Sequence, residues 1–302
     1  KESKGSIKYF KSDLLKEGSY AEAMEGCELV FHTASPYTIS VKDPQKELVD
    51  PALNGTRNVL NQAKKTVSVK RVVVTSSCAA IYCDATDCAK GPNGSLTEEL
   101  WNTTATLDYQ PYSLSKTLAE KEAWKLAEAQ SKWDLVVINP SAVFGPLLNP
   151  NTSTAESLSL MKQLGDGTLK MGAPRFGIGV VDVRDLADAH FEAGFRPQAK
   201  GRHIVSGHNT DFFELGKTLL PKYGDKYPLP KSVAPKWLLM LVGPFVNKAF
   251  TRRYVKNNVD VVWQADNSKS KKALGVSYRP LKETMEDSFQ MLIDENMITS
   301  TK

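Results

Sequence analysis

Tyr112 and Lys116 stand four residues apart in the segment Tyr112-Ser-Leu-Ser-Lys116. Side chains at this spacing lie one turn apart on the same face of a helix, so the lysine ammonium can approach the phenol. A nearby positive charge lowers the pKa of a phenol, which makes the pair a candidate proton donor at neutral pH. Such pairs also arise by chance on solvated helices, so the neighbouring segments have to decide between the two interpretations.

A second candidate, Ser77, ends the run Arg71-Val-Val-Val-Thr-Ser-Ser77, which has the β-branched composition of a buried strand. Ligands of open parallel sheets bind beyond the carboxyl ends of the strands, where Ser77 is expected to lie. A serine at that place is positioned for chemistry. The alternative is a serine that only ends the strand or caps the next turn.

Another segment, Pro140-Ser-Ala-Val-Phe-Gly-Pro146, follows the next apolar strand. Together with Ser77, Tyr112 and Lys116 it resembles the extended short-chain dehydrogenase/reductase family. The resemblance is greatest to the branch of dihydroflavonol reductases, cinnamoyl-CoA reductases and fungal aldehyde/ketone reductases. Further segments that resemble this branch, in its order, are residues 13–15, 30–36, 54–60, 75–77, 112–120 and 181–187.

The resemblance implies a reductase that uses NADPH, with Ser77, Tyr112 and Lys116 as the catalytic residues. In that family, hydride passes from the reduced nicotinamide to a carbonyl carbon, and the oxygen then needs a proton. Tyr112 would donate this proton, Ser77 would hydrogen-bond the same oxygen, and Lys116 would hold the nicotinamide ribose. The other matches to the family's cofactor contacts are Asp13, Leu14, Thr33, Ala34, Ser35, Thr75, Pro140, Ser141 and Val143. For each of these matches the alternative is an ordinary structural role, such as ending a strand.

The substrate pocket is expected to include Cys78 and Tyr82. Tyr82 stands where the flavonol-reducing relatives carry an asparagine that holds substrate hydroxyls, which argues against flavonoid reduction. No residue demands a thioester. We therefore expect a small or medium-sized aldehyde or ketone as substrate. The resemblance to the family implies NADPH rather than NADH as the cofactor.

One departure from the family pattern concerns the phosphate-binding turn. The family's first strand leads into a G-x-x-G-x-x-G turn, and the printed sequence contains no such turn after a strand. The G-x-G at Gly177-Ile-Gly179 does not join a strand to a following helix, and we expect it in a loop. The comparison with the family implies that ~50 residues, including the first βα units, precede Lys1.

The order of apolar segments predicts an α/β fold of the Rossmann type. Short strands are expected at residues 7–10, 29–33, 71–75, 134–139 and 203–206, with helices between them. These elements predict a doubly wound parallel sheet whose first βα units are missing. We assign residues 1–146 and 178–208 to this dinucleotide-binding domain. Residues 147–177 and 209–302 are expected to form a smaller, mixed α/β lobe that binds the substrate.

The composition fits an enzyme of this kind. The 302 residues are 41% hydrophobic and 24% charged, and the formal net charge is +5. The excess of basic residues lies in the last third and lacks the interleaved aromatics of a nucleic-acid platform, so no nucleic-acid partner is expected. The apolar run 237–246 is about half a membrane span and contains Gly243-Pro244, which predicts a buried or lid helix and no membrane partner.

The cysteine and histidine spacings predict no metal site. Four cysteines in a chain of this length fit a reducing cytoplasm, and Cys83 and Cys88 are close enough in sequence to suggest a disulfide on oxidation. A monomer or a homodimer is expected. Two other functions remain open at this point. One is a nucleotide-sugar epimerase or dehydratase with tightly bound NAD, and the other is a non-catalytic, cofactor-sensing or scaffold protein.

Overall fold

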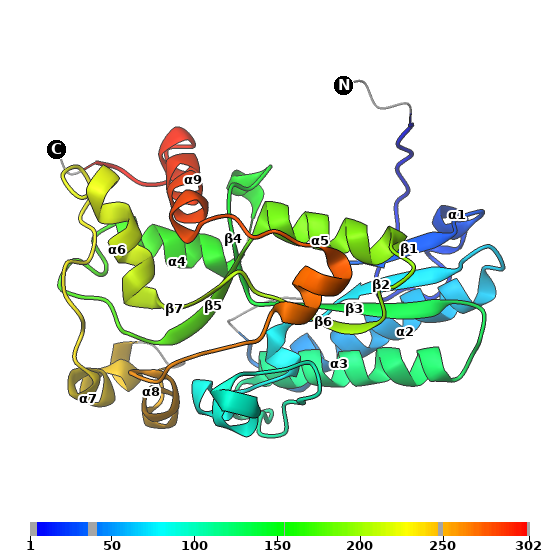
Figure 1. The fold of residues 1–302 in the computed structure, drawn as a ribbon, viewed down its shortest axis with the longest axis horizontal. Coiled ribbons are helices and arrows are strands. Elements are labelled where there is room, and N and C mark those ends of the chain that lie inside the picture. The colour runs from blue at the N-terminus through cyan, green and yellow to red at the C-terminus, as the bar shows by residue number, and fades with distance from the viewer. Residues whose placement is uncertain (1–4, 36–40, 154, 247–249, 301–302) are drawn as a thin grey trace.

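The larger sheet has four parallel strands in the order β1-β2-β3-β6. They comprise Leu29–His32, Arg71–Thr75, Asp134–Pro140 and Gly201–Val205. The computed structural model describes residues 5–35, 41–153, 155–246 and 250–300. His32 pairs with Val74, and Thr75 pairs with Ile138, so the carboxyl ends of these strands meet at one edge of the sheet. Figure 1 shows this edge turned toward the second half of the molecule.

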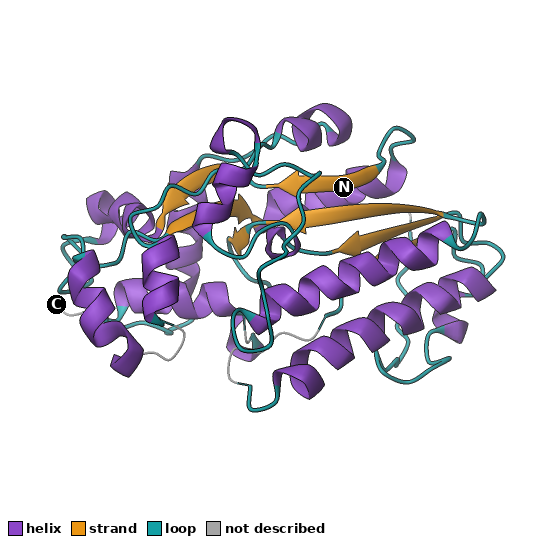
Figure 2. Cartoon of the chain, turned by 90° about the horizontal axis from the view of Figure 1, so that it is seen from below, coloured by secondary structure: helices purple, strands orange, loops and turns teal. Residues whose placement is uncertain are grey.

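Helices cover both faces of this sheet. On one face lie α2 (Asp50–Lys65) and α3 (Pro111–Glu128), which run side by side beneath the strands in Figure 2. On the other face lies α5 (Val183–Phe195). Val72 and Val74 of β2 belong to the core under α2 and α3, whereas Val73 belongs to the core under α5. Successive strand side chains point to opposite faces, so a continuous β-branched run is needed here. The predicted doubly wound parallel sheet is confirmed.

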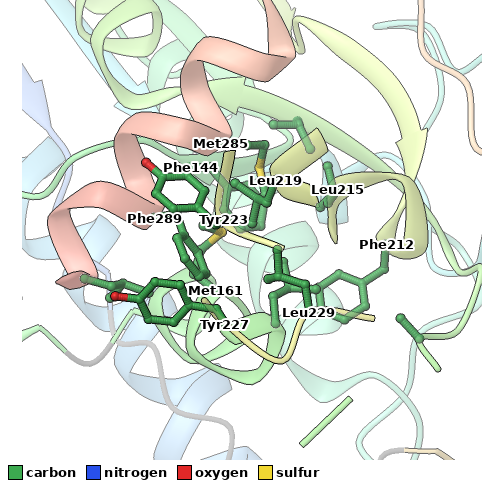
Figure 3. Close-up of a cluster of buried hydrophobic side chains, with 14 of the residues drawn as sticks. Phe144, Met161, Phe212, Leu215, Leu219, Tyr223, Tyr227, Leu229, Met285 and Phe289 are labelled. Atoms are coloured by element: carbon green, nitrogen blue, oxygen red, sulfur yellow. The ribbon is translucent and has the colours of Figure 1, made fainter. Parts of the chain in front are cut away.

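A smaller mixed sheet has the order β4-β5-β7, with β4 at Ala142–Phe144, β5 at Gly177–Asp182 and β7 at His208–Asp211. Around it pack α4 (Glu156–Gly165), α6 (Phe212–Tyr223) and α9 (Leu281–Asp294). Figure 3 shows their shared core, in which Tyr223, Tyr227 and Phe289 form a cluster of aromatic rings. The described helices are completed by α1 (Ala21–Met24), α7 (Lys236–Val246) and α8 (Arg252–Asn258).

β5 joins the two cores. Val180 packs into the core of the smaller sheet, and its neighbour Val181 packs under α5. The segment 178–208 therefore contributes β5 to the smaller sheet and β6 to the larger one. The assignment of residues 1–146 and 178–208 to one domain, and of 147–177 and 209–302 to the other, stays a prediction.

Two predicted local structures are wrong. Residues 7–10 pair with no strand among the described residues, and Ile7 and Tyr9 are 81% and 89% exposed. A strand needs a neighbour for its backbone groups, and this segment has none there. Gly177 and Gly179 lie in β5 rather than in a loop. A Cβ atom on Gly179 would lie 2.3 Å from the ring of Trp263, so glycine is needed because the indole packs directly on the strand.

Candidate active site

Ser77 lies where β2 ends and the short 3₁₀ turn Cys78–Ala80 begins. Its hydroxyl accepts a hydrogen bond from the backbone N–H of Ala79 at 3.1 Å, which caps the turn. Its carbonyl accepts a hydrogen bond from the side-chain amide of Asn139 on β3, also at 3.1 Å. The neighbouring strand therefore fixes the backbone that carries the Ser77 hydroxyl.

Tyr112 lies in the first turn of α3, which begins with Pro111 directly after Gln110. Gln110 has a φ of 58°, a left-handed conformation that turns the chain sharply into the helix. The side chain of Ser77 lies close enough to the phenol of Tyr112 to influence its pKa. Burial raises the pKa of Tyr112 to about 12, the Ser77 hydroxyl opposes this shift, and the carboxylate of Glu156 adds to it.

Lys116 lies one turn further along α3 and is only 8% exposed. Its ammonium nitrogen is 5.9 Å from the centre of the Tyr112 ring. Burial lowers the pKa of Lys116 to about 8, against the opposing effect of Glu120. The expected lowering of the Tyr112 pKa toward neutrality is wrong for this structure, because desolvation of the phenol outweighs every favourable contact. A phenol with a pKa near 12 keeps its proton at neutral pH, as a proton donor must.

Glu120 holds the helix that carries these two residues against the strand ends. Its carboxylate accepts hydrogen bonds from Ser76 Oγ at 2.6 Å, Asn139 Nδ2 at 2.8 Å and Arg202 Nε at 2.6 Å. These three partners come from the end of β2, from β3 and from β6. Glu120 was not predicted as a site residue. The four-residue spacing from Lys116 to Glu120 places both on one helical face, so the pattern could have identified it.

His32 brings the end of β1 to the same place. It is 7% exposed, and burial together with the charge of Lys116 lowers its pKa to about 4. The proximity of His32 to Lys116 means that three neighbouring strand ends surround the start of α3. His32 was also not predicted as a site residue, because a lone histidine in a strand carries no spacing signal.

Comparison with known proteins agrees with this arrangement. A family model described as the 3-beta hydroxysteroid dehydrogenase/isomerase family matches residues 1–209. The chain belongs to this family.

Relatives within the family are reductases. Cinnamoyl-CoA reductase CAD2 from Medicago truncatula is 37% identical over 96% of this chain and 80% of its own length. Tetraketide alpha-pyrone reductase 1 from Arabidopsis thaliana is 32% identical over 98% of this chain and 82% of its own length. The structure of yeast methylglyoxal/isovaleraldehyde reductase Gre2 complexed with NADPH has a TM-score of 0.76 and 30% identity, covering 95% of this chain and 84% of that one. The predicted family, its reductase branch and the oxidoreductase class are confirmed.

The predicted cofactor residues of this family member fall into two groups. Thr33, Ala34 and Ser35 follow β1, and Pro140 and Ser141 end β3, so these residues share the strand edge with Ser77. Ser141 Oγ is buried and has no hydrogen-bond partner among the described residues. An unpaired buried hydroxyl at this edge fits a polar group such as a nicotinamide carboxamide.

The remaining predicted cofactor residues lie differently. Thr75 Oγ1 hydrogen-bonds His190 Nε2 at 2.7 Å, and Val143 packs into the core under α5. The carbonyls of Asp13 and Leu14 accept hydrogen bonds from Asn58 Nδ2 on α2, at 3.4 and 2.9 Å. No described contact joins Asp13 or Leu14 to the Ser77 group. All of these cofactor assignments stay predictions, and we assign no residue to a pyrophosphate.

The two predicted pocket residues line the turn after Ser77. Cys78 is buried, and its thiol hydrogen-bonds the carbonyl of Asn139 at 3.3 Å. The ring of Tyr82 packs edge-on against Trp263, with ring centres 5.6 Å apart.

Cys83 and Cys88 lie further along the same segment as buried free thiols. Burial raises the pKa of Cys83 to about 12, which leaves little of the reactive thiolate and argues against the oxidation hypothesis.

The described residues include no cluster of histidine, cysteine or acidic side chains that could hold a metal ion.

Proposed function

We propose that this protein is an NADPH-dependent reductase that acts on the carbonyl group of a small or medium-sized aldehyde or ketone. The proximity of the Ser77 hydroxyl to the Tyr112 phenol, with Lys116 on the same helical face as Tyr112, carries the proposal. The names of the relatives support it, because these proteins are reductases and one of them is described in complex with NADPH.

Bound NADPH would supply the hydride. Tyr112 holds its proton at neutral pH and is placed to give it to a carbonyl oxygen that gains negative charge. Ser77, capped by the Ala79 N–H, offers a second hydroxyl to the same oxygen and orients it. Lys116 supplies a buried positive charge whose nitrogen is 5.9 Å from the centre of the Tyr112 ring. Its ammonium would hold the ribose hydroxyls and return a proton to Tyr112 after the reaction.

Tyr112→Phe tests the proposal most directly. The variant should oxidise NADPH with a kcat at least ~10²-fold lower on any aldehyde or ketone that the wild-type protein reduces, with the affinity for NADPH within a few-fold. Tyr223→Phe is the matched control, since it removes a buried phenol hydroxyl that donates to Gln290 in the smaller lobe. Near-normal turnover by Tyr112→Phe would refute the assignment of the proton donor.

The products distinguish the two other functions. An epimerase or dehydratase returns its hydride, so a nucleotide sugar would be converted with no net oxidation of NADPH. A cofactor-sensing or scaffold protein would bind NADPH and turn over none of the carbonyl compounds. We propose net oxidation of NADPH, matched one to one by alcohol formed. The cytoplasmic location and the monomeric or homodimeric state stay predictions.

A further inference from the structure

Helix α7 exposes an apolar stripe. Trp237, Leu241 and Phe245 recur every four residues and are 66%, 55% and 87% exposed. Leu238 and Val242, at 37% and 41% exposed, widen the stripe on the same side. A helix at the surface of a globular protein usually turns polar residues outward, and contiguous exposed apolar side chains mark an interaction site.

The opposite side of α7 is already used. Leu239 and Met240 pack against the core of the smaller lobe. The exposed stripe is therefore additional apolar surface. Of the two predicted alternatives, a buried helix is wrong for this side of α7, and a lid helix stays a prediction.

Basic residues surround this helix. Between Asp225 and Asp260 the sequence contains seven lysine or arginine residues and no aspartate or glutamate. Since the whole chain carries +5, the rest of the molecule carries a net charge of −2. Exposed members of this group lie before α7 and on α8, which packs beside α7 at one end of the molecule in Figure 1; they are Lys231, Arg252, Arg253 and Lys256.

We propose that α7 and the exposed basic residues near it, within residues 231–246 and 250–256, dock this protein on the surface of an anionic lipid bilayer. The apolar stripe would enter the boundary between headgroups and acyl chains, while the lysine and arginine side chains contact anionic headgroups. A helix of 11 residues is about 16 Å long, roughly half of the hydrocarbon core, so α7 lies in the plane of the surface. Among the described helices, none has the length and apolarity needed to cross a membrane.

A second copy of the chain is the less favourable occupant. A symmetric contact through α7 would bring two strongly basic surfaces together, and like charges across an interface oppose association. An anionic bilayer neutralises the same charges. The docked surface would also lie next to the segment between β2 and α3, which carries the predicted pocket residues Cys78 and Tyr82, because Asn257 and Asn258 of α8 donate hydrogen bonds to Asp84 in that segment.

Vesicle flotation with the full chain tests the proposal. The protein should float with vesicles of phosphatidylcholine containing about 30% phosphatidylserine and much less with pure phosphatidylcholine. Trp237→Ser/Phe245→Ser should weaken this binding at least ~10-fold, as should Arg252→Glu/Lys256→Glu. Phe191→Ser/Phe195→Ser is the matched control, since these rings are also four residues apart and are 58% and 61% exposed on α5. Circular dichroism of each variant checks that the fold is retained.

The results distinguish a lipid bilayer from a second copy of the chain as the partner that covers the stripe. Binding that is lost in the α7 variant, retained in the α5 control and weakened by raising the salt from about 0.05 to 0.5 M supports the proposal. Absence of wild-type binding, or equal loss in the α5 control, overturns it. The proposal is equally overturned if light scattering shows a wild-type dimer that Trp237→Ser/Phe245→Ser converts to a monomer, since a second copy then covers the stripe.

Discussion

Replacing Lys116 by methionine should stabilise the protein at neutral pH when no nucleotide is present. Lys116 as a whole is 8% exposed, and burial lowers its pKa from 10.5 to about 8. A lowered lysine pKa means that the folded state binds the proton more weakly than the unfolded state does. Methionine fills a similar volume without the charge. Glu120 keeps its hydrogen bonds with Ser76, Asn139 and Arg202 in the variant.

The size of the effect follows from the shift. One pKa unit corresponds to 1.36 kcal/mol, so a shift of about 2.5 units costs the wild-type protein about 3 kcal/mol while the lysine is protonated in both states. This holds below about pH 8. Between about pH 8 and 10.5 the folded protein loses the proton first, and the cost shrinks. Above 10.5 both states are neutral and the cost disappears.

Urea unfolding of both proteins from about pH 7 to 10.5 measures the difference. Lys116→Met should be more stable by about 3 kcal/mol near pH 7, and this advantage should fall toward a small constant at high pH. Lys125→Met on the exposed side of the same helix is the control and should show no such trend. A difference that stays constant with pH, or a wild-type protein that is the more stable one near pH 7, would refute the reasoning.

Three further outcomes are expected. The kcat/KM for NADPH should fall as the pH rises through about 8, because Lys116 loses its charge there, and initial rates of Lys116→Met should lack this fall. Glu120→Gln should lower the free energy of unfolding by about 3 kcal/mol, because Arg202 keeps a buried charge without its carboxylate; a loss below about 1 kcal/mol in urea would contradict this. Gly179→Ala should lower the thermal unfolding temperature, at a cost of about 1–3 kcal/mol, because its Cβ would meet Trp263.

Local patterns were sufficient to predict the larger sheet. The predicted helix between the strands at 134–139 and 203–206 is α5 at Val183–Phe195, and β2 has the predicted bounds of residues 71–75. Both segments carry a strong signal, since β2 is a β-branched run that is buried on both faces and α5 has apolar residues at helical spacing. The strand at Gly177–Asp182 was missed because its glycines are explained by Trp263, which lies more than eighty residues further along the chain.

The candidate site was predictable in identity but not in electrostatics. The spacing of Tyr112 and Lys116 places them on one helical face, and the structure brings Ser77 close to the Tyr112 phenol. The direction of the Tyr112 pKa shift was wrong, because spacing reports which charges are near and says nothing of desolvation. The exposed side of α7 was missed for a related reason. An apolar run predicts that a segment avoids water, whereas only the packing of Leu239 and Met240 shows which side faces the core.

The contacts that fix the geometry of the site also impose a free-energy cost on folding. Glu120 ties α3 to β2, β3 and β6, which fixes Tyr112 and Lys116 relative to Ser77. That rigid attachment also keeps Lys116 out of water, and its lowered pKa measures the penalty. A bound cofactor would relieve part of this penalty, because its ribose hydroxyls would accept hydrogen bonds from the ammonium. NADPH should therefore bind more weakly to Lys116→Met, even though that variant is the more stable protein without nucleotide. A single substitution should therefore raise the folding stability and lower the cofactor affinity. A charge positioned for function produces this pair of opposite changes, whereas a purely structural lysine would not produce it.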